Sequence, residues 1–460
     1  MSEESKNNSE KVYEYRGLNG MVYARPSSGG LISERTMKLS NPASLTYTMG
    51  STVNFLVNCT EAVWGPGSYL KMKVNMTVPA GRRGFITGSI MNLFSQIRYS
   101  HRSGELLSQT LFSDVLANVN LKYRTSVSDY AKLYTLIGGN KFPGAGDFGP
   151  FVDEANSDGS AKDYYFAVPM SLFLPEFDNH NQYIPASLIS GSRLEIVLNN
   201  DAATSGICSY VTDGAGNITP PGNLGLVTIN SVEPIMILDS CRPFDELTKQ
   251  LHEESADVEA SGLQYTYSTH FGSQFTPGTS GAVNVDVLQS VSIAERAFIV
   301  FTVPDTVTTN NKYNFVSLAP TLGNNSGYAW QWRLGSQFKP LYSVSNDVES
   351  YMLTCQAFNS GFNQFSRDPA HTGVSIESFG SGHTVADGGG PLKQGTSCVY
   401  SCALEKSANG LSMTGDSSNN SRLLNFSVQG CTNLNLKATV FLSYVRCANL
   451  MIDSLSLIHI

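Results

Sequence analysis

The stretch "SQIRYSHRSGELLSQTLFSDVLANV", residues 95–119, contains three kinds of local structure in a fixed order. An alternating run up to Ser100 predicts a strand, "HRSG" predicts a tight turn, and "ELLSQTL" predicts the return strand of a hairpin. The following "SDVLANV" predicts a helix, with Ser113 or Asp114 as its N-cap. The stretch therefore predicts one hairpin–helix unit.

The same order returns in "QWRLGSQFKPLYSVSNDVESYML", residues 331–353, with little identity between the letters. Here Asn346 is the expected N-cap of the helix. Because loops tolerate insertion better than strands do, a duplicated domain should keep the order of its elements while its loops change length. The recurrence therefore suggests that the chain contains two related halves, and chance recurrence of generic strands is the alternative.

Three further pairs of strands support the duplication, because they follow one another in the same order in each half. "FAVPMSLFL" begins at 166 and "CVYSCALEK" at 398, and "SRLEIVLNN" begins at 192 and "SRLLNFSVQ" at 421, so the offsets are 232 and 229 residues. The third pair, "LGLVTINSVEPIMIL" and "LNLKATVFLSYVRCA", is offset by 210 residues. A long loop in the first half without a counterpart in the second explains the shorter offset.

The composition indicates an all-β protein with many loops. The chain has 460 residues, of which 41% are hydrophobic, only 15% are charged and 41 are glycine, and a chain of this length can bury two cores. Each half offers seven or eight short strands. We therefore predict two tandem eight-stranded antiparallel jelly rolls with short helices in the loops. The expected division is an N-terminal arm (1–43), a first jelly roll (44–242), a connecting helix and linker (243–260) and a second jelly roll (261–460).

The charge pattern does not indicate a nucleic-acid-binding protein. The formal net charge is −8, and residues 1–36 carry five basic and five acidic side chains, whereas an arm that packages nucleic acid would be strongly positive. We expect this arm to order against a protein neighbour, and a disordered tail is the alternative. The sequence has no run of about 20 apolar residues, as a membrane span requires. The first residues lack the apolar region of a signal peptide, so secretion is not expected.

The eight cysteines are expected to be small buried hydrophobic residues and not ligands or disulfide partners. No Cys-x-x-Cys pair occurs, and the spacing of Cys398 and Cys402 in "CVYSC" places both on one face of a strand. A zinc site is the alternative, but it would lack a second pair and a nearby histidine.

No set of residues forms a convincing catalytic, cofactor or metal site, and we predict no enzymatic activity and no cofactor. The seven histidines are scattered, and no motif of a metalloprotease, hydrolase or P-loop occurs. An acidic loop fits a calcium-binding template in part, but Tyr165 stands where the template requires glutamate. A solvated loop is the favoured interpretation. The histidines are His101, His180, His252, His270, His371, His383 and His459, and the loop carries Asp153, Glu154, Asn156, Asp158, Gly159 and Asp163.

A few other residues could take part in binding. Trp330 and Trp332 alternate along a strand and share a face, which favours core packing over a platform for sugar stacking. The turn segments 213–217 and 82–83 could hold a cation and a phosphate, but plain turns are at least as well supported. A glycan-processing enzyme would need paired carboxylates, for which Glu176 and Asp178 are the candidates.

The sequence resembles the double jelly-roll major capsid proteins of tailless double-stranded DNA viruses. The resemblance is greatest to those of polinton-like viruses and virophages and extends to the adenovirus and giant-virus lineage. It is carried by "VPMSLF" (168–173), "IPASL" (184–188), the strand 194–198 and the hairpin "QIRYSHRSGELL". Met170 departs from the leucine that relatives prefer. The resemblance covers residues 44–455, and the second half matches by order more than by motif.

This resemblance implies a major capsid protein that assembles into homotrimers and tiles an icosahedral shell. Its expected partners are neighbouring capsomers and minor capsid proteins of the penton and cement types, without sequence-specific binding of nucleic acid. The expected location is the virion, after synthesis inside the host cell. The alternatives are a tandem β-sandwich that binds or processes glycans, and a minor capsid protein.

Overall fold

The computed structural model describes part of the chain. The described residues are 32–78, 80, 83–86, 89–125, 133, 136–138, 158–179, 183–200, 207–210, 225–243, 263–277, 281–302, 315–319, 327–358, 374, 379, 397–404, 416–418, 422–431, 436–450 and 455–458.

The first half folds into two four-stranded antiparallel sheets. One sheet has the order β1-β12-β4-β8 and the other has the order β2-β9-β6-β7. In chain order, the eight strands are β1 (Ile32–Ser40), β2 (Thr52–Val57), β4 (Tyr69–Thr77), β6 (Phe94–Ser100), β7 (Leu106–Leu111), β8 (Ala161–Pro169), β9 (Ser192–Leu198) and β12 (Thr228–Pro243).

The second half repeats this topology strand for strand. Its sheets have the orders β13-β20-β15-β18 and β14-β19-β16-β17. In both halves the first sheet takes the first, eighth, third and sixth strands, and the second sheet takes the second, seventh, fourth and fifth. The strands are β13 (Leu263–Phe275), β14 (Ala282–Val287), β15 (Ala294–Thr302), β16 (Ala329–Leu334), β17 (Gln337–Val344), β18 (Tyr400–Ala403), β19 (Leu424–Gln429) and β20 (Lys437–Leu450).

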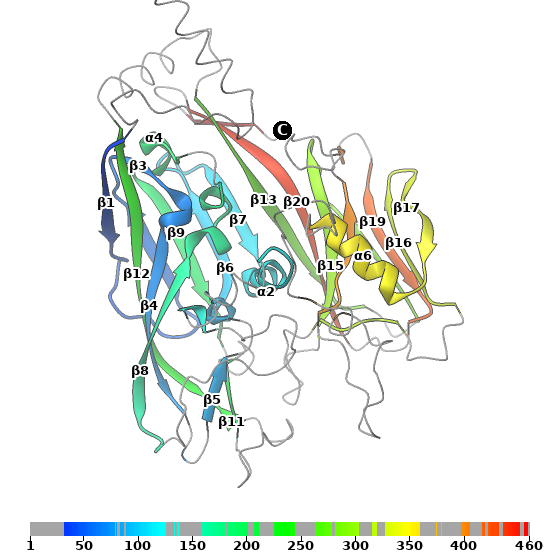
Figure 1. Cartoon of the computed structure of the whole chain (residues 1–460), viewed down its shortest axis with the longest axis horizontal. Helices are drawn as coiled ribbons and strands as arrows, with labels where there is room; N and C mark the ends of the chain where they lie inside the picture. Colours follow the sequence, from blue (N-terminus) through cyan, green and yellow to red (C-terminus); the bar gives the residue numbers. More distant parts are fainter. Residues whose placement is uncertain are drawn as a thin grey trace, which may run out of the picture.

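The two rolls lie side by side (Figure 1). Shorter strands and helices connect or extend their main strands. A small sheet forms with the order β11-β10-β5, while β3 pairs with β12 and β21 pairs with β20. These elements are β3 (Ala62–Val63), β5 (Arg83–Ile86), β10 (Ile207–Tyr210), β11 (Gly225–Leu226), β21 (Leu455–Ile458), α2 (Ser113–Tyr123), α4 (Ala186–Ile189), α6 (Asp347–Ala357) and the 3-10 turns Gly65–Gly67, Ile90–Leu93, Met170–Leu172 and Pro175–Phe177.

The predicted fold class, two tandem eight-stranded jelly rolls, is confirmed. The paired landmarks fall on equivalent strands: β8 with β18, β9 with β19, and β12 with β20. The duplicated hairpin–helix unit is also confirmed, as β6, β7 and α2 in the first roll and as β16, β17 and α6 in the second. Gly104, with φ +86°, turns the first hairpin in the left-handed region that glycine tolerates.

The start of the first roll differs from the expectation that strands begin near residue 44. The strand β1 lies within the range expected as an arm, and it pairs along its length with β12. No apolar alternation marks "ISERTMKLS", because β1 is an edge strand that leaves most of its side chains exposed. The expected connecting helix lies outside the described residues, which do not include 244–262.

The two helix N-caps differ from each other. Asn346 caps α6 as predicted, and its side chain accepts a hydrogen bond from the Glu349 amide at 2.8 Å. For α2 the helix is confirmed, but its predicted N-cap, Ser113 or Asp114, is wrong. The cap position is Phe112, in a left-handed conformation without a capping side chain, and the Ser113 hydroxyl donates to the Phe94 carbonyl at 2.6 Å.

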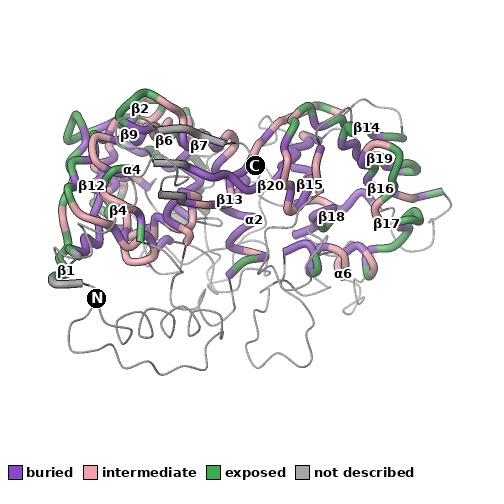
Figure 2. Tube along the Cα trace, turned by 90° about the horizontal axis from the view of Figure 1, so that it is seen from above, coloured by how far each residue is buried: buried purple, intermediate pink, exposed green. Residues whose placement is uncertain are grey.

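Each roll has its own apolar core, and α2 joins the two cores at the seam between the rolls (Figure 2). Ala117 and Leu121 of α2 pack in the first core. Val115, Leu116, Val119 and Tyr123 of the same helix pack in the second core. In return, Tyr265 and Tyr267 of β13 and Ala448 of β20 pack in the first core.

Candidate functional site

The carboxylates that a glycan-processing enzyme would use do not line an open cleft. Glu176 is fully buried, and burial raises the pKa of its carboxyl to about 7, although the Ser108 hydroxyl and the Arg446 charge act in the opposite direction. Asp178 is held by the Arg124 guanidinium at 2.7 Å. Retaining and inverting glycosidases both need two carboxyl groups that reach the sugar. The described geometry therefore gives this alternative no support.

A cavity that Asp178 helps to line is too small for a sugar. It has a volume of about 20 Å³, and its lining includes Asn120 and Arg124 from α2, Asp178, and His270 from β13. Such a volume suits about one water molecule. The buried Oδ1 of Asn120 and Nδ1 of His270 have no partner among the described residues, and they are the polar atoms that a water would satisfy. This space belongs to the packing of the seam.

The tryptophan pair packs in the core, as the alternation predicts. Both Trp330 and Trp332 are buried in the second roll. The Trp330 Nε1 donates to the Ser350 hydroxyl at 2.8 Å, and its ring packs edge-on against Tyr400, with centroids 5.4 Å apart. Phe426 contacts both indoles. Neither indole is accessible for stacking on a ligand.

The other candidate ligands are separate from one another or lie outside the described residues. Asp158 accepts hydrogen bonds from the amide and the hydroxyl of Ser160, at 2.9 and 2.6 Å, and so completes a local turn. Residues 153–157 and 213–217 and the side chains of Arg82 and Arg83 are not among the described residues. Within the described part of the chain, no group of three or more histidine, cysteine or acidic side chains could hold a metal ion.

The cysteines and histidines that can be placed are structural. Seven cysteines among the described residues are buried and are not joined in disulfides, and Cys208 is not described at the side-chain level. His101 shares a hydrogen bond with Ser103 at 2.9 Å and contacts the Ser187 carbonyl at 3.1 Å. His270 is buried in the seam, and the other five histidines lie outside the described residues.

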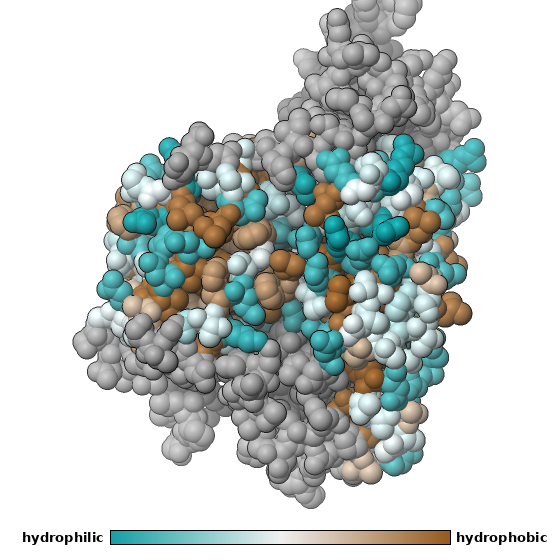
Figure 3. Space-filling model, turned by 180° about the vertical axis from the view of Figure 1, so that it is seen from behind, coloured by the Kyte–Doolittle hydropathy of each residue, from teal (hydrophilic) through white to brown (hydrophobic). Residues whose placement is uncertain are grey.

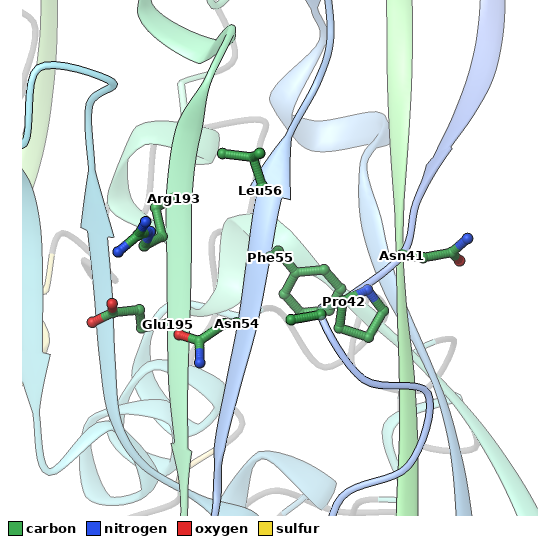
Figure 4. A pocket seen from close by; sticks show the side chains of 8 residues that line it. Asn41, Pro42, Asn54, Phe55, Leu56, Arg193 and Glu195 are labelled. Carbon is green, nitrogen blue, oxygen red and sulfur yellow. The ribbon is translucent and has the colours of Figure 1, made fainter.

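A groove of about 470 Å³ opens on the first roll. Its lining includes Pro42 and the buried Phe55, which are neighbours on one side of β2, while Asn54 and Leu56 of β2 point to the other side with Arg193 of β9 (Figure 4). Leu56 is 55% exposed. The groove is partly open to solvent, and its lining is of mixed polarity. These properties suit contact with another protein surface better than enclosure of a small ligand.

Two strand edges expose large apolar side chains. The first, which we name the β17–α6 face, comprises Phe338, Leu341 and Tyr342 of β17 with Val348 and Met352 of α6. The second, which we name the β1 edge, comprises Met37 and Leu39. On the face seen from behind, apolar side chains also form separate groups among hydrophilic ones (Figure 3). Exposed apolar groups on strand edges are typical of surfaces that bind proteins.

These two surfaces were not predicted, although one signal in the sequence points to the first. Pro340 interrupts "QFKPLYSV", and proline within a strand is confined to sheet edges because it has no N–H to donate. The apolar residues Phe338, Leu341 and Tyr342 also fall on both faces of the strand, which does not fit a half-buried strand. The sequence offers no comparable signal for the β1 edge.

No described helix has the length and apolar character needed to cross a membrane. No protein-family model and no curated protein sequence matches the chain. The comparisons therefore depend on the fold.

Solved structures of viral capsid proteins share this fold along nearly the whole chain. A chain of the Sputnik virophage, solved by cryo-EM, matches with a TM-score of 0.60 and 13% identity, covering 96% of this chain and 92% of that one. The Faustovirus major capsid protein matches with a TM-score of 0.56 and 8% identity, covering 95% and 93%.

The mavirus major capsid protein matches with a TM-score of 0.54 and 11% identity, covering 97% of this chain and 94% of that one. At these identities the similarity establishes the architecture and not the activity. The expected resemblance to double jelly-roll major capsid proteins is thus confirmed at the level of the fold, and this chain has their tandem jelly-roll architecture.

Proposed function

We propose that the protein is a major capsid protein whose homotrimers tile an icosahedral virus shell. One observation carries the proposal: the same eight-strand topology occurs twice in one chain. Three such chains around a threefold axis present six similar rolls, and a block with six similar sides can pack against six neighbours in a sheet. The similarity to the capsid proteins of Faustovirus and mavirus supports this role.

The remaining features agree with a structural role. The carboxylates Glu176 and Asp178 are committed to the seam between the rolls, and the tryptophans are committed to a core, so we propose that the protein is not an enzyme. Its partners would be neighbouring capsomers and minor capsid proteins, and its location would be the virion. We retain the proposed division of the chain, with the first roll extended to begin at Ile32 because β1 is its first strand.

The proposal is tested by the mass of the purified protein under native conditions. We expect light scattering to report three chains of 49.8 kDa each, and we expect this mass to persist on dilution because shell-forming trimers must survive before assembly. A stable monomer at all concentrations would contradict the proposed function. Binding or cleavage in a panel of glycans would favour the tandem β-sandwich alternative.

A further inference from the structure

Within one chain, the second roll covers one particular surface of the first. This surface is formed by β7 and α2, and the strands β13 and β20 lie against it (Figure 2). The Leu107 carbonyl of β7 accepts hydrogen bonds from the Tyr267 hydroxyl at 2.8 Å and from the Arg446 guanidinium at 2.5 Å. Ten of the eleven residues of α2 are buried. The helix of this hairpin–helix unit is therefore almost entirely buried, and the second roll covers part of β7.

The equivalent surface of the second roll is uncovered. It is the β17–α6 face, formed by the fifth strand and the helix that follows it, as β7 and α2 are in the first roll. Leu341 is 87% exposed and Tyr342 57% exposed, and only five of the eleven residues of α6 are buried. On α6, Val348 and Met352 are four residues apart and so lie on one side of the helix, both exposed. An apolar surface that is covered in one roll is thus left open in the other.

The first roll has its own counterpart of β13, the strand of the second roll that packs against β7. This counterpart is β1. The strand β13 is the first strand and an edge strand of the second roll, and β1 is the first strand and an edge strand of the first roll. Each pairs antiparallel with the eighth strand of its roll. While β13 packs on the neighbouring roll, the β1 edge leaves Met37 55% and Leu39 69% exposed.

The two uncovered surfaces lie at opposite ends of the chain (Figure 1). They therefore cannot cover each other within one molecule. A contact between two different surfaces of identical chains is heterologous, and it closes into a ring when the rotation between copies divides the full circle.

We propose that the β17–α6 face of one copy binds the β1 edge of a second copy. This contact repeats between chains the seam that each chain already contains between its rolls. Three copies then close a ring of six rolls through six related seams, three within chains and three between them. The inference rests on the proposed trimeric capsid protein and names the surfaces that hold it together.

The first test replaces one exposed side chain on the β17–α6 face. Leu341→Asp places a charge in the proposed contact, while Leu288→Asp changes an equally exposed leucine, 81% accessible, that lies outside it. We expect light scattering to show one chain of 49.8 kDa for Leu341→Asp and three chains for wild type and for Leu288→Asp. Circular dichroism should show the same β content in all three proteins, because both leucines are exposed in the single chain.

A second variant tests the proposed contact independently of whether Leu341→Asp folds. Leu39→Asp changes the opposite surface, the β1 edge, and should also give a folded single chain. The two variants are then mixed. Each mixed pair retains one intact contact, from the β17–α6 face of the Leu39→Asp chain to the β1 edge of the Leu341→Asp chain. The mixture should therefore yield a two-chain complex that cannot close.

The outcomes separate this inference from the proposed function. A trimeric wild type with trimeric Leu341→Asp and Leu39→Asp variants would overturn the proposed contact and leave the capsid function standing. A mixture that forms trimers, or that gives no complex even after chemical cross-linking, also contradicts the contact. A monomeric wild type would remove both the function and the inference.

Discussion

At the scale of single residues, two buried tryptophans of β16 differ mainly in the hydrogen bonding of the indole N–H. The Trp330 N–H has a partner in Ser350, whereas the Trp332 N–H is buried without a partner among the described residues. Replacing Trp330 by phenylalanine loses volume and a hydrogen bond, and we expect a loss of about 2 kcal/mol in the free energy of unfolding. Trp332→Phe loses similar volume but removes an unsatisfied donor. Urea unfolding followed by circular dichroism should therefore show the smaller loss for Trp332→Phe, and equal losses would contradict the assignment.

The seam between the rolls contains a carboxyl group that makes stability depend on pH. Because burial raises the pKa of Glu176 from 4.5 to about 7 in the folded state, its contribution is fully present below pH 4.5 and is lost as the pH rises through 7. The expected loss is about 3 kcal/mol across this window. Glu176→Gln stays neutral, so the variant should gain on wild type as the pH increases from 5 to 8.5.

The difference between wild type and Glu176→Gln isolates this effect from another buried group. Burial and the charges of Arg296 and Arg124 lower the pKa of His270, so its contribution changes in the opposite sense and is lost on acidification. His270 is present in both proteins and cancels in the comparison. Urea midpoints of the two proteins that run parallel between pH 5 and 8.5 would show that Glu176 does not titrate there.

At the scale of elements, a bidentate ion pair joins the edge strand β1 to the neighbouring strand β12. The Arg35 guanidinium donates to both oxygens of Asp239, at 2.8 and 2.5 Å, and the Asp239 side chain is fully buried while that of Arg35 is 61% exposed. Arg35→Ala leaves the buried carboxylate without its cation, which costs more than the loss of an exposed pair.

A second ion pair on β1 supplies the control for this change. Lys38 lies 2.9 Å from Glu61, and both side chains are partly exposed, so Lys38→Ala should lower stability only slightly. We expect thermal unfolding to show a clearly larger decrease in Tm for Arg35→Ala. If both variants lose the same stability, the Arg35 pair does not hold β1 in the way described.

Some of these elements could be predicted from the sequence, and others could not. Strands with one buried face, such as β9 with Leu194, Ile196 and Leu198 buried, were predicted because burial imposes alternation. The N-cap Asn346 was predicted because an asparagine cap is a local signal. The cap of α2 was not, because Phe112 takes its left-handed conformation where the helix packs into the seam. The strand β1 was missed because its pairing with β12 depends on contacts that the local pattern does not encode. For the β17–α6 face, Pro340 was a local signal, but it was not used.

At the scale of the whole molecule, the duplication explains both the fold and the proposed assembly. The order of elements in the two halves was enough to predict two jelly rolls, since strand order survives changes in loop length. The way in which the rolls meet was not predictable, because the seam joins β7 and α2 to strands more than a hundred residues later. That seam is the feature from which the contact between chains is inferred.

The measurement that tests the central claim most directly is an image of the purified wild-type oligomer by single-particle electron microscopy. The account predicts a ring with threefold symmetry and six roll-sized densities, in which the boundaries between chains resemble the boundaries within them. A single two-lobed particle, or an oligomer in which the paired rolls are not arranged around a threefold axis, would contradict it.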